Sequence, residues 1–420
     1  MQLQRSSNGQ LVRLSASSTL GVGGEARIFA IEGAAHLAAK VYHRPAQAHE
    51  AKLGAMLANP PSDPMAGQNL VSIAWPIDLL LTPDGSRCVM GFLMPRVREM
   101  YPIIDFYHPK TRRQKHPLFN YRYLLRTARN LVGCVNALHA RGYVIGDLNE
   151  SNILAGETAL VSLVDTDSFQ VPDPNGGQIH RCYVGKPEFT APELQGTRFA
   201  SADRLPEHDL FGVAVLIFQL LMEGVHPFAG QYKGRGEPPL LEERIANGLF
   251  PYAPDTRAEI LPMPTAPRFD LLDSNIRELF LRCFIEGHAN PSLRPDTQSW
   301  QQALLQAEGA LATCPANDQH CYTARLNFCP WCERRTQLRG VDPFPSRGAV
   351  RQRSHLQQLP VLPRLASPGP RACDRAIEIA IARVRSLRRE RRLFAAALCV
   401  LGTLVVGYWS WVVRLLILHQ

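Results

Sequence analysis

The sequence predicts an α+β protein of two lobes, a small β-rich N-lobe at about residues 10–97 and a helical C-lobe at about residues 98–310. Short apolar runs between turn residues, such as LVRL, ARIFAI and HLAAKVY, indicate a small antiparallel sheet near the N-terminus. Two longer segments, YRYLLRTARNLVGCVNALHARG and HDLFGVAVLIFQLLMEG, have apolar residues at helical spacing. The second is apolar nearly all round, so we expect a buried central helix.

Composition agrees with a folded globular protein, because 45% of the 420 residues are hydrophobic and 20% are charged. The net charge is +9, but residues 351–420 contain 12 Arg and only three acidic residues. The excess positive charge therefore lies in this tail, and residues 1–350 sum to zero. A neutral body argues against a nucleic-acid-binding surface, so we expect no nucleic-acid partner.

The C-terminal tail predicts a single-pass membrane anchor. Residues 393–413, LFAAALCVLGTLVVGYWSWVV, are 21 residues without a charge, and a helix of that length crosses a hydrocarbon core about 30 Å thick. The preceding RVRSLRRERR (383–392) contains six Arg, so the positive-inside rule keeps the large N-terminal part in the cytoplasm. We expect the cell inner membrane as the location. A buried C-terminal core helix is the alternative.

Ordered motifs in the C-lobe point to chemistry. In YVIGDLNESNILAGETALVSLVDTDSF (143–169), Asp147 and Asn152 are five residues apart, and Asp165 follows Asn152 by thirteen. VGKPEFTAPE (184–193) and NPSLRPD (290–296) follow in order. Together these segments resemble the catalytic loop, metal-binding segment and activation segment of Ser/Thr protein kinases. The resemblance covers about residues 10–310. It implies a bilobal protein-kinase-like fold and transfer of the γ-phosphoryl group of ATP to Ser or Thr of a protein substrate.

The resemblance also assigns roles to residues. Asp147 would accept the proton of the attacking hydroxyl, and Asn152 and Asp165 would hold Mg²⁺ or Mn²⁺. Lys40 would hold the α/β-phosphates, with Glu50 as its candidate partner. The Gly-rich turn in LGVGGEARIF lets backbone N–H groups approach phosphates, although a plain hairpin turn is the alternative. The remaining nucleotide-binding candidates are Gly21, Gly23 and Gly24 of this turn, and Met94 and Arg96 of the hinge in GFLMPRV.

The sequence departs from the family around its catalytic aspartate. Ile145 and Gly146 stand where active kinases usually have His-Arg, which implies a kinase not switched by a phosphorylated activation loop. The glycine usual in the metal-binding segment is Asp167. The usual catalytic-loop Lys is Asn149, whereas Lys186 stands where the activation segment usually has Thr. We expect Lys186 to supply the missing positive charge near the transferred phosphoryl group, as a second catalytic residue.

Two functions therefore stay open from the sequence. The joint presence of four chemically essential groups favours a membrane-anchored, ATP-dependent Ser/Thr protein kinase. These groups are Lys40, Asp147, Asn152 and Asp165. The substitutions around those groups favour an ATP-binding pseudokinase scaffold that recruits signalling partners.

A cysteine cluster follows the kinase-like segment and predicts a structural zinc site. The CPWC motif places the thiolates of Cys329 and Cys332 on one metal, and Zn²⁺ takes four N or S ligands. Cys314 is the third candidate. Cys321 and His320 compete for the fourth place, because the spacing between Cys314 and Cys321 is longer than usual in such sites.

This cluster lies in a predicted zinc ribbon at residues 311–336. The segment after it contains VDPFPS and LPVLPRLASPGP with little apolar periodicity, which predicts a proline-rich, basic linker at residues 337–382. Kinase-like domain, ribbon, linker and membrane helix together resemble the kinase of the bacterial TerY-phosphorylation triad, on the segments NDQHCY, CPWC and GVGGEARIF. That resemblance implies a metal-dependent protein phosphatase and a von Willebrand A-type protein as partners.

Overall fold

The computed structural model describes residues 1–68, 70–173, 179–254 and 259–357, and residues 1–357 form one compact unit. The later part of the predicted linker and the predicted membrane helix at residues 393–413 lie outside the described residues. Within the described ranges, every helix is too short or too polar to cross a bilayer.

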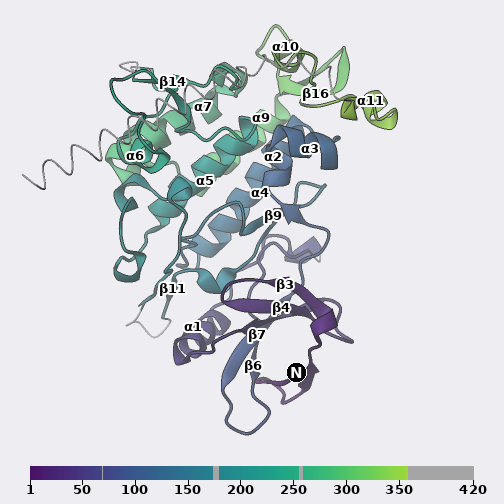
Figure 1. The fold of residues 1–420 in the computed structure, drawn as a ribbon, viewed down its shortest axis with the longest axis vertical. Helices are drawn as coiled ribbons and strands as arrows, with labels where there is room; N and C mark the ends of the chain where they lie inside the picture. The colour runs from purple at the N-terminus through teal and green to yellow at the C-terminus, as the bar shows by residue number, and fades with distance from the viewer. Residues whose placement is uncertain (69, 174–178, 255–258, 358–420) are drawn as a thin grey trace, which may run out of the picture. The chain divides into compact units, whose positions relative to one another are not determined.

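The N-lobe is a seven-stranded antiparallel sheet in the order β2-β1-β6-β7-β5-β4-β3. Figure 1 shows this sheet in the lobe that contains the N-terminus. It begins at Gln2, before the predicted boundary at residue 10. α1 (Gln47–Ala58) follows β5 in the chain and packs against β7. The strands are β1 (Gln2–Arg5), β2 (Leu11–Arg13), β3 (Thr19–Val22), β4 (Ala26–Ala30), β5 (Leu37–Tyr42), β6 (Asp78–Leu81) and β7 (Val89–Pro95).

The two faces of β5 have different surroundings, because successive side chains of a strand point to opposite sides. Ala39 and Val41 join a small apolar cluster of the N-lobe, whereas Lys40 and Tyr42 lie on the other face. A Cβ at Gly91 would lie 2.0 Å from the carbonyl oxygen of Lys40. Glycine at this position of β7 therefore permits the close strand pairing behind Lys40.

The C-lobe is built around α4 (Tyr121–His139), α5 (Pro206–Leu221) and α9 (Thr297–Gly309). α4 contacts both of the others, and α5 is buried from Asp209 to Leu221, as its apolar pattern predicts. The predicted α+β architecture, with a β-rich N-lobe and a helical C-lobe, is confirmed. The other C-lobe helices are α2 (Ile104–Tyr107), α3 (Pro109–Lys115), α6 (Leu241–Ala246), α7 (Ser274–Leu281) and α8 (Gly287–Ala289).

Four small sheets complete the described chain. β8, β9 and β10 form a sheet in the order β10-β9-β8, and the other three sheets are the pairs β11-β12, β13-β14 and β15-β16. The hairpin of β9 and β10 connects the catalytic-loop sequence to the segment with Asp165. The strands are β8 (Tyr101–Pro102), β9 (Ile153–Ala155), β10 (Val161–Leu163), β11 (Val171–Pro172), β12 (Ile179–His180), β13 (Gly230–Tyr232), β14 (Ile260–Pro262), β15 (Leu311–Cys314) and β16 (Asn317–Thr323).

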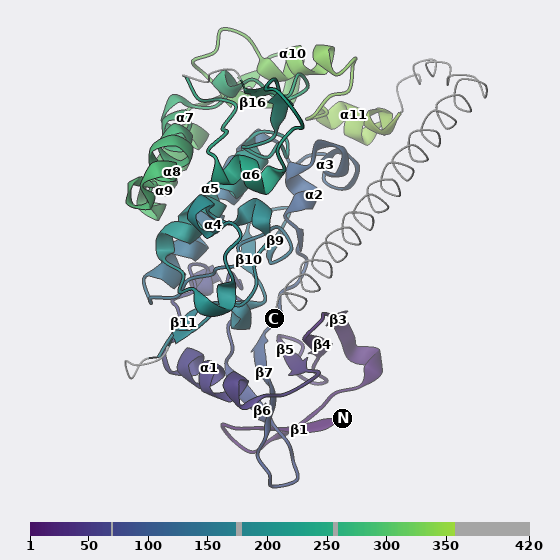
Figure 2. The same cartoon turned by 60° about the vertical axis from the view of Figure 1, so that its left-hand side comes forward.

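The cysteine-rich segment is part of the C-lobe and not a separate ribbon. Trp331 of α10 (Pro330–Gln337) packs on Tyr121 of α4 at 5.0 Å between ring centroids, and both belong to the main core. Both views place α10 at the end of the C-lobe far from the N-lobe sheet (Figure 2). Arg334 forms a buried ion pair with Glu223 at 2.6 Å. Such a pair is stable only in a well-ordered interface, because its desolvation must be repaid.

The prediction of a linker from residue 337 is wrong for its first part. Residues 337–357 fold back on the C-lobe and contain α11 (Arg347–Arg351) and a 3₁₀ turn at Ser354–Leu356. Arg112 of α3 explains the attachment, because its guanidinium donates to the carbonyl oxygen of Pro343 and lies over the Phe344 ring at 4.4 Å. Proline content alone did not reveal these long-range contacts.

Candidate active site and metal centre

A pocket of about 280 Å³ lies beneath the Gly-rich hairpin of β3 and β4. Its polar end carries Lys40, Asp165 and Asp167, and its wall also includes Gly21 and Arg96. An apolar cavity with charged groups at one end fits a nucleotide, which has an aromatic base and anionic phosphates. The apolar part of the wall is formed by Leu20, Ile28, Ala38, Ala74, Met94 and Val164.

The Gly-rich turn closes as an ordinary hairpin. The Gly23 amide donates to the carbonyl oxygen of Ala26 at 2.9 Å, and both Gly23 and Gly24 are exposed. Of the three predicted glycines, Gly21 lines the pocket wall, while Gly23 and Gly24 form the turn beside it. The hinge candidates Met94 and Arg96 both line the wall of the pocket.

Lys40 lies between two carboxylates. Its Nζ is 2.5 Å from Oδ1 of Asp165 and 2.5 Å from Oδ1 of Asp167. Burial alone would lower the pKa of the Lys40 ammonium, but Asp167 and Asp165 outweigh it and raise the pKa above its ordinary value. Lys40 is therefore a fixed, charged donor at the polar end of the pocket. Asp165 itself has a left-handed backbone, with φ of 61°.

The predicted partner of Lys40 is not the one observed. Glu50 is exposed on α1 and forms no ion pair with any described residue. On α1, Glu50 points outward, whereas Lys52 is half-buried and burial lowers the pKa of its ammonium. The partner that sequence reasoning missed is Asp167, which the sequence marks only as a replacement for the usual glycine.

Hydrogen bonds hold the catalytic-loop residues together. The side-chain amide of Asn149 donates to Oδ1 of Asp147 at 2.8 Å, and that of Asn152 donates to Oδ2 at 3.2 Å. The backbone of Asn152 also accepts from the Val164 amide at 3.0 Å, which links this loop to the segment preceding Asp165. Both oxygens of Asp147 are thus oriented by amide donors, as a positioned general base requires.

Arg204 occupies the space behind the catalytic loop and was missed from the sequence. Its guanidinium donates to the carbonyl oxygens of Gly146 and Val184, which joins the catalytic loop to the activation segment. Gly146 has φ of +72°, and a Cβ there would lie 2.9 Å from the guanidinium of Arg204. The absence of the usual Arg at residue 146 is therefore matched by another Arg from a later part of the chain.

Lys186 lies against the catalytic loop but does not contact Asp147 in the described structure. Its ammonium is 2.9 Å from Oε1 of Glu150 and 2.8 Å from Oγ of Ser151. The loop therefore receives a positive charge from the activation segment, at the residues directly after Asn149.

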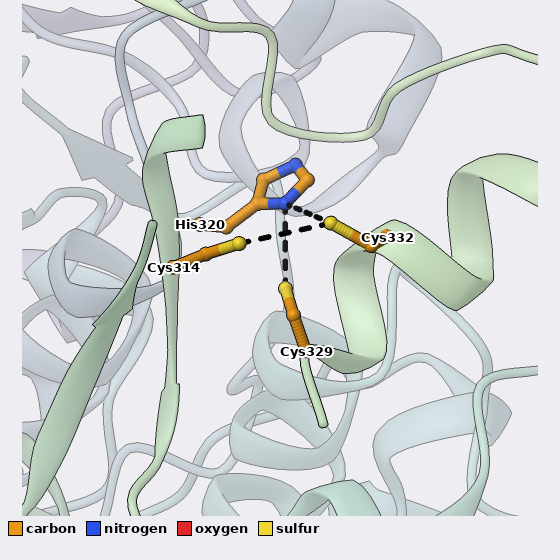
Figure 3. Close-up of side chains that lie close together, drawn as sticks. All are labelled: Cys314, His320, Cys329 and Cys332. Atoms are coloured by element: carbon orange, nitrogen blue, oxygen red, sulfur yellow. Dashed lines mark hydrogen bonds between the residues drawn. The ribbon is translucent and has the colours of Figure 1, made fainter. Parts of the chain in front are cut away.

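Four of the five zinc-ligand candidates, three cysteines and one histidine, lie together in the structure (Figure 3). The ligand atoms of Cys314, His320, Cys329 and Cys332 all lie within 4.8 Å of one another. Nδ1 of His320 points at the thiols, 3.4 Å from Cys329 Sγ and 3.5 Å from Cys332 Sγ. Three thiols and an imidazole are a donor set typical of structural zinc sites.

Cys321 is excluded from this group by its position on β16. Adjacent residues of a strand face opposite sides, so His320 at the thiols places Cys321 in the hydrophobic core. A further residue supports the site, because Nε2 of His320 is 2.9 Å from Oδ1 of Asp342. A carboxylate on the second ring nitrogen fixes the orientation of a metal-binding histidine. Asp342 lay in the predicted linker and had no recognisable pattern.

Comparison with known proteins gives the following relatives, while no family model matches the chain. The chain is 35% identical to protein kinase YegI of Escherichia coli K12 over 329 residues. This alignment covers 78% of the chain and 49% of YegI. YegI of E. coli O157:H7 is 35% identical over 316 residues, 74% of this chain and 48% of that protein. The chain thus spans about half the length of the curated relatives it matches.

More distant similarity extends to eukaryotic kinases. Mouse 3-phosphoinositide-dependent protein kinase 1 is 25% identical over 201 residues, 46% of this chain and 33% of that protein. Among solved structures, the ROP18 kinase domain in complex with AMP-PNP and sucrose aligns with a TM-score of 0.48 and 15% identity, over 73% of this chain and 83% of that one.

Proposed function

We propose that this chain, a homologue of protein kinase YegI over 329 residues, is an ATP-dependent protein kinase that phosphorylates Ser or Thr of protein substrates. The observation that carries the proposal is the joint geometry of four groups. Lys40 and Asp165 meet at the polar end of an apolar pocket, and Asp147 and Asn152 are hydrogen-bonded to each other on the adjoining loop. These are the groups that phosphoryl transfer to a hydroxyl requires.

Each group has a proposed role that follows from its surroundings. The apolar wall would bind the base of ATP, and Lys40 would pair with its α/β-phosphates. Asp165 and Asn152 would hold Mg²⁺ or Mn²⁺, which neutralises phosphate charge. Asp147, oriented by two amide donors, would accept the proton of the substrate hydroxyl. Lys186 would supply positive charge near the transferred phosphoryl group, in place of the cation absent at Asn149.

The proposal is tested by incubating the purified full chain in detergent with γ-labelled ATP, Mg²⁺ or Mn²⁺ and a generic protein acceptor. We expect label in the chain or the acceptor, and a roughly 10²- to 10⁴-fold slower reaction for Asp147→Asn, because that variant keeps the shape and loses the base. Nucleotide binding without transfer by the parent protein would contradict kinase activity and favour the pseudokinase scaffold.

Membrane attachment is a second part of the proposal and rests on the sequence alone. The uncharged residues 393–413 behind six Arg support a single-pass anchor with the kinase part in the cytoplasm. The full chain is expected in the membrane fraction, and a variant lacking residues 393–413 in the supernatant. Recovery of the full chain in the supernatant without detergent would rule out the anchor.

A metal-dependent protein phosphatase and a von Willebrand A-type protein are the partners we propose from the TerY-triad resemblance.

A further inference from the structure

The two carboxylates that contact Lys40 have different environments. The side chain of Asp165 is 44% exposed, whereas that of Asp167 is 6% exposed. In protein kinases generally, the phosphate-binding Lys is paired with a Glu of the N-lobe helix, and the aspartate of the metal-binding segment holds Mg²⁺. An aspartate buried against the Lys by the segment that also carries the metal ligand is a different arrangement.

The N-lobe helix of this chain cannot provide the usual acid. Glu50 is the only acidic residue of α1 and is exposed. The charged residue that α1 turns toward the sheet is Lys52, which is half-buried. A second cation near Lys40 would repel it, so the ammonium of Lys40 depends on carboxylates from another part of the chain.

Asp167 uses both carboxylate oxygens within the protein. Oδ1 contacts Lys40, and Oδ2 accepts from the Tyr42 hydroxyl at 2.8 Å. Tyr42 is two residues after Lys40, so both side chains leave the same face of β5. The Tyr42 ring stacks on His49 at 4.0 Å between centroids. The adjacent Thr166 is buried and donates to the carbonyl oxygen of Ala74 at 2.9 Å, which fixes the turn.

We propose that Asp167 is the positioning residue that holds Lys40 at the nucleotide phosphates, in place of an acid on α1, and leaves Asp165 free to bind the metal. This inference rests on the proposed nucleotide site. Lys40 keeps its anchor when Asp165 turns to Mg²⁺, because Asp167 and Tyr42 remain. The anchor also belongs to β5 and the metal-binding segment, so a movement of α1 does not disconnect it.

The test is nucleotide affinity, measured by calorimetry on the full chain in detergent with ADP in Mg²⁺ and with ADP in EDTA. Asp167→Asn keeps the shape and the Tyr42 acceptor but removes the charge. We expect its affinity for ADP in Mg²⁺ to fall about tenfold or more, since a charge-assisted hydrogen bond is lost. In EDTA the loss should be smaller, because Asp165 then stays on Lys40.

Two further variants separate positioning from a structural role. Asp167→Glu restores the carboxylate and should recover part of the affinity in Mg²⁺, and Glu50→Gln should bind ADP like the parent. Equal losses for Asp167→Asn in Mg²⁺ and EDTA, or parental affinity in both, would overturn the inference, as would a larger loss for Glu50→Gln. If Asp167→Asn fails to fold, Tyr42→Phe is compared with the parent in the same two buffers. Parental affinity of Tyr42→Phe in Mg²⁺ then overturns the inference, because the Tyr42 hydroxyl holds the Asp167 carboxylate. A loss of affinity, relative to the parent, that is larger in Mg²⁺ than in EDTA supports it, even where the parent transfers no phosphate.

Discussion

Asp165→Ala is expected to lose nearly all metal-dependent phosphoryl transfer, by at least about 10³-fold, because a bound metal contributes several kcal/mol of transition-state stabilisation. The same variant should lose the thermal stabilisation that Mg²⁺-ATP gives the parent. A ligand at a hundred times its dissociation constant stabilises the native state by about 2.7 kcal/mol, which is readily measured as a shift in Tm. Asp165 is the exposed acid at the polar end of the pocket, so its removal should leave the fold intact.

Asp84→Ala is the matched control, because Asp84 is an exposed acid in the hairpin between β6 and β7 and does not line the pocket. Thermal unfolding is measured for parent and variants with Mg²⁺-ATP, with ATP in EDTA and without nucleotide. A shift for Asp165→Ala with Mg²⁺-ATP equal to that of the parent would show that Asp165 is not the metal ligand.

Spacing alone singled out the catalytic-loop candidates because these residues are close in sequence. Asp147 and Asn152 lie on one loop, and Asp165 follows through a two-stranded hairpin whose apolar strands fix the separation. The partner of Lys40 was harder to predict, because tertiary packing decides which face of α1 is buried. The buried residues are Leu53, Ala55 and Met56, while Glu50 is exposed and Lys52 half-buried. The spacing of Glu50 from Lys40 does not indicate this orientation.

Long-range contacts account for the other differences between the sequence-based predictions and the structure. Arg204 reaches the catalytic loop from a segment that is 58 residues away in sequence, and no spacing rule identifies it. The choice between His320 and Cys321 depends on which side of β16 faces the CPWC turn. That choice is made by packing: the Cys321 side chain lies in the hydrophobic core, so the adjacent His320 faces the thiols.

Loss of the metal is expected to destabilise the C-lobe, because the cysteine cluster is joined to its core. Replacing Cys332 by Ser removes one of four ligands, and three ligands cannot close a structural site. Without the metal, α10 keeps its Trp331 and Arg334 contacts but loses the link from its first turn to Cys314 and His320. Because the free energy of metal binding adds to that of folding, we expect a lower free energy of unfolding and a lowered Tm, with zinc falling from one per chain to near zero.

Cys321→Ser is the matched control, since it removes a neighbouring thiol that faces the core, and it should retain one zinc per chain. Asp342→Asn should keep the fold and weaken zinc affinity about 10- to 100-fold, as expected for a group that orients a ligating His.

No residue of the cysteine cluster lines the proposed nucleotide pocket, so Cys332→Ser should still bind Mg²⁺-ATP at temperatures well below its lowered Tm. Zinc content is measured by atomic absorption on protein purified without chelator. Zinc retained by Cys332→Ser, or lost by Cys321→Ser, would contradict the assignment of ligands, because each outcome requires a different set of four donors.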